Sequence, residues 1–213
     1  MENYRTDEEQ VEALKRWWET NGKVVILFGI LFVAGTVGGN VWMDYKHSTA
    51  SKASTEYDLM MQEMQTGKAE AAMQRGATLM EQHKDSTYAA LAALAVAKLE
   101  VEKGDYSAAG SRLKWVLDNV TETNVQHVAR LRLIRVMVEE SKLDEALALA
   151  NIAEAGKFKP EYDVLKGDIY VAKGQSDLAR GAYQAALSGE GLSPQTTSEL
   201  RLKLDDLGGG ASS

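Results

Sequence analysis

One long apolar run interrupts the mixed pattern of hydrophobic and polar positions along the chain. It consists of 20 uncharged residues, Val24 to Met43, between Lys23 and Asp44. At about 1.5 Å of rise per residue, a helix of that length covers about 30 Å, the thickness of a bilayer's hydrocarbon core. Eleven of the residues are Val, Ile, Leu or Phe, and each of these favours insertion by about 0.3 to 0.6 kcal/mol. The run predicts a transmembrane helix over 23–45.

The same run is a poor match to a cleaved signal peptide. A signal peptide has a short basic segment followed by an apolar stretch of about 7 to 15 residues. Here the preceding segment is long and acidic, the apolar run is longer, and Ser48-Thr49-Ala50 is only a weak cleavage site. We therefore expect a membrane anchor that is retained in the mature protein.

The basic residues near the run favour a cytoplasmic N-terminus. Cytoplasmic flanks of membrane helices carry an excess of Lys and Arg. Because large domains can cross the membrane largely regardless of charge, the small excess leaves the opposite orientation open. Four basic residues precede the run (Arg5, Lys15, Arg16 and Lys23) and two follow it closely (Lys46 and Lys52).

The leader, residues 1–22, is expected to form a short amphipathic helix. Thr6 and Glu9 have the spacing of a capping box at its start, and Asn21-Gly22 is a suitable stop. The helix either rests at the lipid headgroups through its aromatic residues or docks onto a cytoplasmic partner. Its apolar face would contain Val11, Leu14, Trp17 and Trp18.

Small residues within the apolar run suggest a contact with another membrane helix. Gly35 and Gly39 form a GxxxG pattern, and Asn40 follows directly. Small residues on one face let a second helix approach closely. Because glycine is common in membrane helices, a chance occurrence is the alternative.

After the apolar run, a short turn-like segment recurs at intervals of 37, 37 and 33 residues, at 67–72, 104–109, 141–146 and 174–179. Each copy begins with Gly or Ser and has an alanine five residues later. Apolar positions with helical spacing flank every copy. A period of about 34 residues in helix–turn–helix units is typical of tetratricopeptide repeats.

The last copy matches that repeat best. Gly and Ala suit positions where two antiparallel helices touch, and Gly174 at the turn can adopt a left-handed backbone. The earlier copies depart from the pattern: Glu100 stands where Tyr is usual, Ser141 replaces the turn Gly, and Gly76 occupies an aromatic position. The matching residues of the last copy are Gly167, Tyr170, Gly174, Ala179, Tyr183 and Ala186.

These patterns predict an all-α protein in which a single transmembrane helix precedes a tetratricopeptide-like α-solenoid. The leader (1–22) and the span (23–45) are followed by the repeat domain (46–207) and a flexible tail (208–213). A last helix, with Leu200, Leu204 and Leu207 on one face, is expected to cap the open end of the stack. Helices are expected over about 7–20, 23–65, 69–83, 86–103, 106–119, 123–140, 143–155, 161–173, 176–188 and 195–206.

Composition argues against several classes of function. A net charge of −7 is unsuited to nucleic acid, because binding to phosphates depends on Lys and Arg. The absence of cysteine excludes disulfides and thiolate metal sites. His47, His83 and His127 fall in different units without metal-ligand spacing, and no catalytic motif is present. We expect no cofactor, no metal site and no enzymatic activity.

The first helices of the repeat units are expected to line a concave surface that binds another polypeptide. That surface would be apolar with two basic residues, which suits an apolar or amphipathic segment. The alternative is that the same residues form the core, since Leu and Val at helical spacing are usually buried. The candidates are Leu91, Leu94, Lys98, Val101, Val128, Leu131, Arg135, Val138, Val164 and Val171.

Taken together, these segments resemble the YfgM family, the ancillary subunits of the bacterial SecYEG translocon. The resemblance rests on the leader (Gln10 to Trp18 and Asn21-Gly22-Lys23), the single span, and degenerate repeats that include Leu131-Arg132-Leu133. It implies a bacterial inner-membrane protein with a cytoplasmic N-terminus and a periplasmic repeat domain. It also implies association with SecYEG, with the periplasmic chaperone PpiD, with secretory client polypeptides and with membrane lipid. A link to envelope-stress signalling is implied as well, and the resemblance carries over no catalytic residues.

Two other functions remain open on the sequence alone. The chain could be a membrane-tethered scaffold for another envelope assembly complex, or an enzyme whose site is hidden in the repeat domain.

Overall fold

In the computed structural model, the backbone is described for residues 7–209, and the side chains within that range except those of 7–9, 38, 40–42, 44–49 and 209. All regular elements in the described part are helices, as predicted. The helices are α1 (Asp7–Gln65), α2 (Ala69–Gln82), α3 (Thr87–Glu102), α4 (Tyr106–Asn119), α5 (Thr123–Glu139), α6 (Leu143–Ala150), a 3-10 turn η1 (Gly156–Phe158), α7 (Lys159–Ala172), α8 (Ser176–Ser188) and α9 (Pro194–Gly209).

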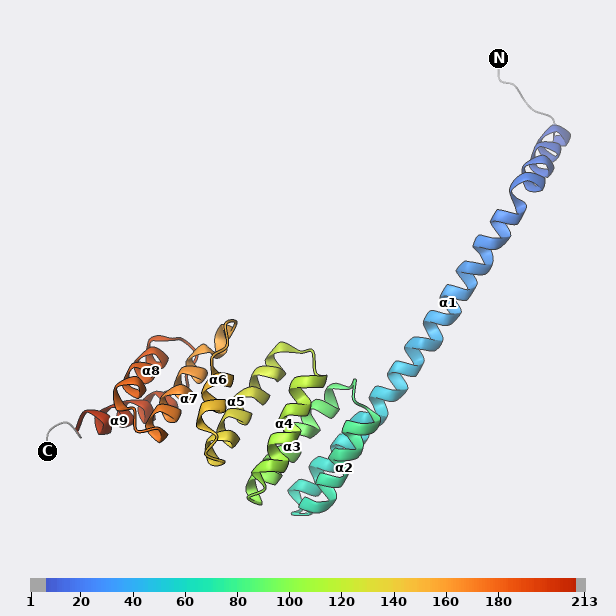
Figure 1. Cartoon of the computed structure of the whole chain (residues 1–213). Helices are drawn as coiled ribbons and strands as arrows, with labels where there is room; N and C mark the ends of the chain where they lie inside the picture. Colours follow the sequence, from blue (N-terminus) through green and yellow to red (C-terminus); the bar gives the residue numbers. More distant parts are fainter. Residues whose placement is uncertain (1–6, 210–213) are drawn as a thin grey trace. The chain divides into compact units, whose positions relative to one another are not determined.

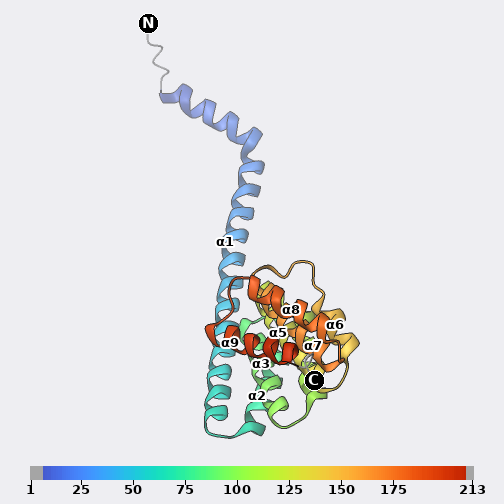
Figure 2. The same ribbon diagram turned by 90° about the vertical axis from the view of Figure 1, so that its left-hand side faces the viewer.

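The chain divides into two compact units, 1–52 and 53–213. Helix α1 is continuous, so the apolar run and the first helix of the repeat domain belong to one element. The predicted stop at Asn21-Gly22 is wrong, because the helix passes through both residues. The Asn21 side chain donates to the Trp17 carbonyl (3.1 Å) inside the helix. Figure 2 shows the first turns of α1 lying at an angle to the rest of the first unit.

The second unit is a stack of antiparallel helices. Helices α2 to α8 lie side by side in chain order, each packed against the next (Figure 1). Buried side chains fill the space between successive helices along the whole stack. Met60, from the last turns of α1, shares a core cluster with Leu79 of α2 and Val96 of α3. The end of α1 therefore serves as the first helix of the first repeat unit.

Four equivalent turns join the helix pairs. The turn residues are Gly67, Gly104, Ser141 and Gly174, and they have φ angles of 75°, 80°, 60° and 70°. All four lie in the left-handed region, as the repeat pattern predicts. In each turn the next residue's N–H donates over 2.8 Å to a carbonyl five residues earlier: Lys68 to Glu63, Asp105 to Glu100, Lys142 to Met137, and Gln175 to Tyr170.

The alanine that follows each turn lies where the two helices of a pair touch. Any larger side chain at these positions would have to displace a neighbouring helix, because interiors are close-packed. The four residues, Ala72, Ala109, Ala146 and Ala179, are fully buried.

One departure from the repeat pattern, Gly76, is compensated by large side chains on the neighbouring helices. In the last pair, the large residue is Tyr183 on the second helix and the small one is Gly167 on the first. The first pair reverses the sizes: Met60 is on the first helix, and its sulfur lies 3.2 Å from where a Cβ on Gly76 would be. Gly76 replaces an aromatic residue because Met60 and Val96 fill the space from the other side.

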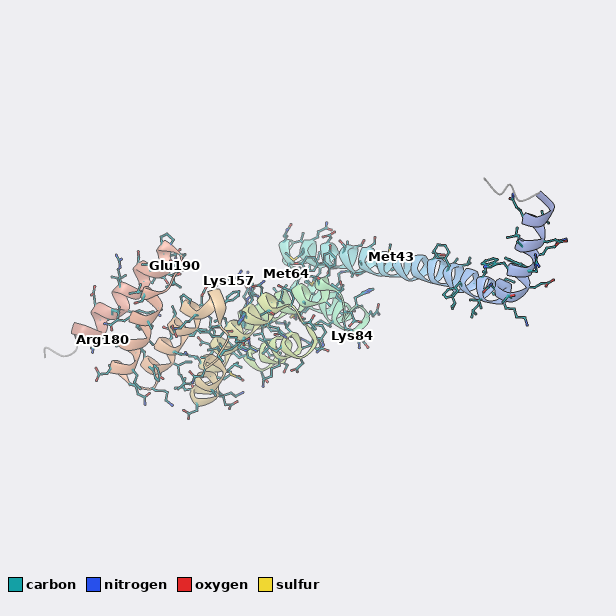
Figure 3. The ribbon with its side chains drawn as sticks, turned by 90° about the horizontal axis from the view of Figure 1, so that it is seen from above. Met43, Met64, Lys84, Lys157, Arg180 and Glu190 are labelled. Atoms are coloured by element: carbon teal, nitrogen blue, oxygen red, sulfur yellow. The ribbon has the colours of Figure 1, made fainter. Side chains whose placement is uncertain are left out.

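Helix α6 ends at Ala150, earlier than expected, and the chain reaches α7 through a loop and η1. Helix α7 begins slightly earlier than expected, and Pro160 occupies its first turn, where the missing N–H is not required. Figure 3 shows Lys157 and Glu190 on neighbouring loops at one edge of the stack.

Helix α9 covers the end of the stack, as predicted. Leu200 is fully buried, and Leu204 and Leu207 pack against the same cluster as Tyr183. Arg180 of α8, labelled in Figure 3, donates to the Leu207 carbonyl (2.8 Å). The last helix pair therefore has an apolar cover and a polar tie to it.

Candidate interaction surfaces

The described residues contain one helical segment that is long and apolar enough to cross a bilayer. It lies within Gln10–Val37, and its most apolar 18-residue stretch has a mean hydropathy of 1.7. Its large side chains are exposed, including Phe28 (67%) and Phe32 (73%). The Thr36 hydroxyl donates to the Phe32 carbonyl (3.0 Å), so it is satisfied inside the helix. An exposed apolar helix with internally satisfied polar groups suits a lipid environment.

The predicted contact residues Gly35 and Gly39 are open. A Cβ built on either would meet no atom within 4 Å, so a second helix could approach the backbone closely there. Asn40, the third residue of the predicted contact, has its side chain outside the described residues.

The residues predicted to line a concave groove divide into three groups by exposure. Leu94 and Leu131 are 7% and 6% exposed and belong to the main core cluster. These two residues therefore belong to the core and do not line a groove. Leu91, Val128, Val138 and Val164 are half-buried, whereas Lys98, Val101, Arg135 and Val171 are exposed.

The exposed members come from the first helix of successive pairs, α3, α5 and α7. Val101 and Val171 each lie three residues before a turn residue, whereas Lys98 and Arg135 lie six residues before one. Lys98 is paired on its own helix with Glu102 at 3.6 Å. The remaining surface is a narrow mixed stripe and not a continuous apolar groove.

Arg132, which lies between two of the buried leucines of α5, ties two of these helices together. Arg132 of α5 donates from Nη1 to the Leu94 carbonyl of α3 at 3.1 Å. A charged donor on a backbone carbonyl is stronger than a neutral hydrogen bond. Arg132 therefore fixes the spacing of α3 and α5 and has a structural role.

His127 is buried and has polar and aromatic partners. Its Nδ1 shares a hydrogen bond with the Tyr162 hydroxyl over 2.9 Å, and its ring stacks on Phe158 at 4.7 Å between centroids. Burial lowers the pKa of His127, and the charge of Arg130 lowers it further. No group of three or more potential metal ligands occurs among the side chains that the structure describes.

Two Glu–Arg pairs occupy equivalent positions in the first two repeat units. In each, the Glu lies four residues before the turn residue and the Arg eight residues after it. Arg75 binds Glu63 at two points, Nε to Oε2 at 3.0 Å and Nη2 to Oε1 at 2.8 Å, and its Nη1 reaches Glu56 at 2.5 Å. This hydrogen bonding by Arg75 lowers the pKa of Glu63.

The second pair is incomplete. Arg112 reaches Glu100 only through Nε to Oε1, at 3.2 Å. Glu100 is 6% exposed, and its Oε2 has no hydrogen-bond partner among the described groups. Burial raises the pKa of Glu100, and the hydrogen bond from Arg112 only partly offsets it.

Glu100 lines a surface pocket of about 460 Å³ between α2, α3 and α4. The apolar part of its wall comes from Met73 and Ala77. In the sequence, Glu100 stands out only as a departure from the usual Tyr. The repeated Glu–Arg spacing of twelve residues was the available signal for this site. The other lining residues are Glu70, Gln74, Lys103, Asp105 and Arg112.

Comparisons with known proteins cover nearly the whole chain. A family model described as a tetratricopeptide repeat-like domain matches residues 15–209. The chain is similar to the ancillary SecYEG translocon subunit of Haemophilus influenzae, with 31% identity over 94% of this chain and 97% of that protein. It is also similar to the proteins of that name in Aggregatibacter actinomycetemcomitans (30% identity, 92% of this chain, 96% of that protein) and Escherichia coli (28%, 97%, 99%).

A solved structure shares the fold. MamA (residues 41 to the end) from Desulfovibrio magneticus RS-1 superposes with a TM-score of 0.54 over 76% of this chain and 98% of that one. At 18% identity, this likeness concerns the fold alone. The family model and the full-length relatives agree, and the chain belongs to the family of ancillary SecYEG translocon subunits, which is built on a tetratricopeptide repeat-like domain.

Proposed function

We propose that this protein is a single-span, inner-membrane subunit that attaches a protein-binding repeat domain to the SecYEG translocon. The observation that carries the proposal is similarity, over 94% of this chain and 97% of the relative, to a protein named for that role. The exposed apolar part of α1 supports a membrane anchor. In this proposal residues 1–22 are cytoplasmic, 23–45 span the membrane, and the repeat domain is periplasmic.

The repeat domain holds proteins and does not make or break bonds. Its partners would be the chaperone PpiD and secreted polypeptides that leave the channel, and modulation of envelope-stress signalling would follow from holding a regulator. Tethering a domain beside the channel raises its local concentration into the mM range for short linkers, so that weak contacts suffice. The exposed stripe with Lys98, Val101, Arg135 and Val171 is the proposed contact surface for these partners.

Affinity capture of the tagged chain from solubilised membranes, followed by quantitative mass spectrometry, tests the proposal. Translocon subunits and PpiD should be enriched together. Enrichment of a different envelope complex in their place would favour the alternative, a membrane-tethered scaffold for another assembly.

Two sets of variants assign the contacts. Gly35→Leu with Gly39→Leu should reduce recovery of the translocon, because bulky side chains keep a partner helix away. Gly29→Leu is the matched control, since Gly29 is equally open but lies on another helical face. For the stripe, Val101→Glu with Val171→Glu should reduce crosslinking of PpiD, whereas Leu178→Glu on α8, at least as exposed as either valine, should not. Unchanged recovery or crosslinking would remove the corresponding contact.

A further inference from the structure

The two equivalent Glu–Arg pairs differ in a way that isolates one unsatisfied group. Glu63 has both oxygens bonded by Arg75, while Glu100 has one bonded by Arg112 and one without a partner in the described structure. The unsatisfied carboxylate is also the more buried one, with its side chain 8% exposed against 19% for Glu63. A buried acceptor without a donor costs about 1 to 3 kcal/mol, and more when it is charged. The position therefore favours a donor that the fold itself does not supply.

Two of the charged lining residues are already engaged. Lys103 pairs with Glu70, which also lines the pocket. Asp105 caps helix α4 by accepting from the Ala108 N–H at 3.0 Å. Among the ionisable lining residues, three are carboxyls and two are basic. The excess of carboxyls favours a bound group that brings a donor and a positive charge.

The rest of the pocket suits a long aliphatic stem. Met73 and Ala77 provide an apolar wall on α2, and Lys and Arg side chains bury their methylene groups along such surfaces while the charged head stays polar. The volume of about 460 Å³ lies within the range of sites for small ligands. A flexible thioether at Met73 can adapt to the stem.

We propose that the pocket between α2 and α4 binds a Lys or Arg side chain of another polypeptide, and that the Glu100 carboxylate turns toward the pocket so that Oε2, enclosed in the unbound structure, accepts from its charged nitrogen. The guanidinium of Arg75 on Glu63 is the internal precedent for the contact. The site is separate from the exposed stripe on α3, α5 and α7, and it does not depend on the translocon assignment.

The test follows the methyl group of Met73 in the full chain. The protein is labelled with ¹³C-methyl methionine, held in detergent micelles, and titrated with N-acetyl-arginine amide at constant ionic strength. The neutral isostere N-acetyl-citrulline amide is the matched ligand. Met73→Leu assigns the signal. The arginine amide should shift the Met73 signal saturably, and the citrulline amide should bind about tenfold more weakly or worse, since it lacks the charge-assisted bond.

Three variants test whether Glu100 and the pocket account for the binding. Glu100→Gln should weaken binding of the arginine amide about tenfold or more, whereas Glu63→Gln, in the equivalent pair outside the pocket, should leave it unchanged. Gln74→Arg places a guanidinium in the pocket from α2 and should block the titration, which keeps the test decisive if Glu100→Gln folds poorly. The proposal is overturned if Met73 shows no saturable shift, if both amides act alike, or if Arg112 closes on both oxygens and excludes the ligand.

Discussion

The ring of Tyr183 occupies the space that a side chain on Gly167 would need. A Cβ at residue 167 would lie 2.2 Å from Cε1 of Tyr183, far inside van der Waals contact. Tyr183 is itself fully buried and donates to Asp168 at 2.7 Å, so its ring is held in place. The close approach of α7 and α8 therefore depends on glycine at this position.

Gly167→Ala should lower the free energy of unfolding by about 1 to 3 kcal/mol, because overpacking outweighs the gain in helix propensity. Urea unfolding measures the change. Gly181→Ala on α8 is the matched control, since a Cβ there meets nothing within 4 Å, and it should stabilise the protein by up to about 1 kcal/mol. Equal stabilities for the two variants would contradict the packing described.

Ser141→Gly should stabilise the third turn. Ser141 has φ = 60°, and the left-handed backbone costs a residue with a side chain about 1 to 2 kcal/mol. Part of this gain is lost because glycine is more flexible in the unfolded chain, so we expect up to about 1 kcal/mol. The reverse change at an equivalent turn, Gly174→Ser, should destabilise by about 1 kcal/mol. A thermal unfolding series checks both signs, and a destabilising Ser141→Gly would show that the side chain is needed there.

Glu100→Gln and Glu63→Gln should differ in their effects on stability at neutral pH. The raised pKa of Glu100 means that the folded state holds its proton more tightly than the unfolded state does. Its contribution to stability is therefore present below the ordinary value of 4.5 and is lost as the pH rises above it. The lowered pKa of Glu63 has the reverse consequence: that contribution is present above 4.5 and is lost as the pH falls below it.

Relative to the unchanged chain, Glu100→Gln should be neutral or stabilising at pH 7 and Glu63→Gln should be destabilising. Both differences should shrink in acid. Urea unfolding of the two variants at pH 4 and pH 7 measures them. If both variants were destabilised at pH 7, the contrast between the Glu100–Arg112 pair and the Glu63–Arg75 pair would be contradicted.

His127 should make the protein less stable in mild acid. Its pKa is lowered by burial, so between the ordinary value of 6.5 and the lower folded value the unfolded state binds more protons. Stability therefore falls as the pH drops below 6.5. His127→Gln keeps a hydrogen-bonding group near Tyr162 and removes the titration.

We expect His127→Gln to cost stability at pH 7 through lost stacking on Phe158 and to approach the unchanged chain at pH 5. Chemical unfolding at the two pH values supplies the comparison. A cost that stays the same at both values would mean that His127 titrates normally in the folded protein.

The repeat architecture could be predicted because left-handed turns and close helix contacts each favour particular residue types. Gly67, Gly104 and Gly174 mark positions where the backbone is left-handed, and Ala72 and its equivalents mark where helices touch. The exchange of large and small residues between Met60 and Gly76 could not be foreseen, since it depends on which helices face each other.

Three features lay beyond the sequence pattern for physical reasons. The helix continues through Asn21-Gly22 because a glycine costs a helix only about 1 kcal/mol, which strong helix formers on both sides outweigh. Leu and Val at helical spacing predict burial but not the surface that buries them, so the sequence left both a groove and the core open for Leu94 and Leu131. The sequence shows the twelve-residue spacing of Glu100 and Arg112. It cannot show that one oxygen of Glu100 lacks a hydrogen-bond partner, because that depends on how the helices pack.

Site-specific photocrosslinking in living cells tests the central claim most directly. A photoreactive residue is placed at Phe32 in the span or at Val171 in the repeat domain, both of which are exposed. Our account predicts that Phe32 crosslinks to a translocon subunit and Val171 to a periplasmic chaperone or a secreted polypeptide. Crosslinks from both positions to an unrelated envelope complex, or recovery of the chain outside the membrane, would contradict it.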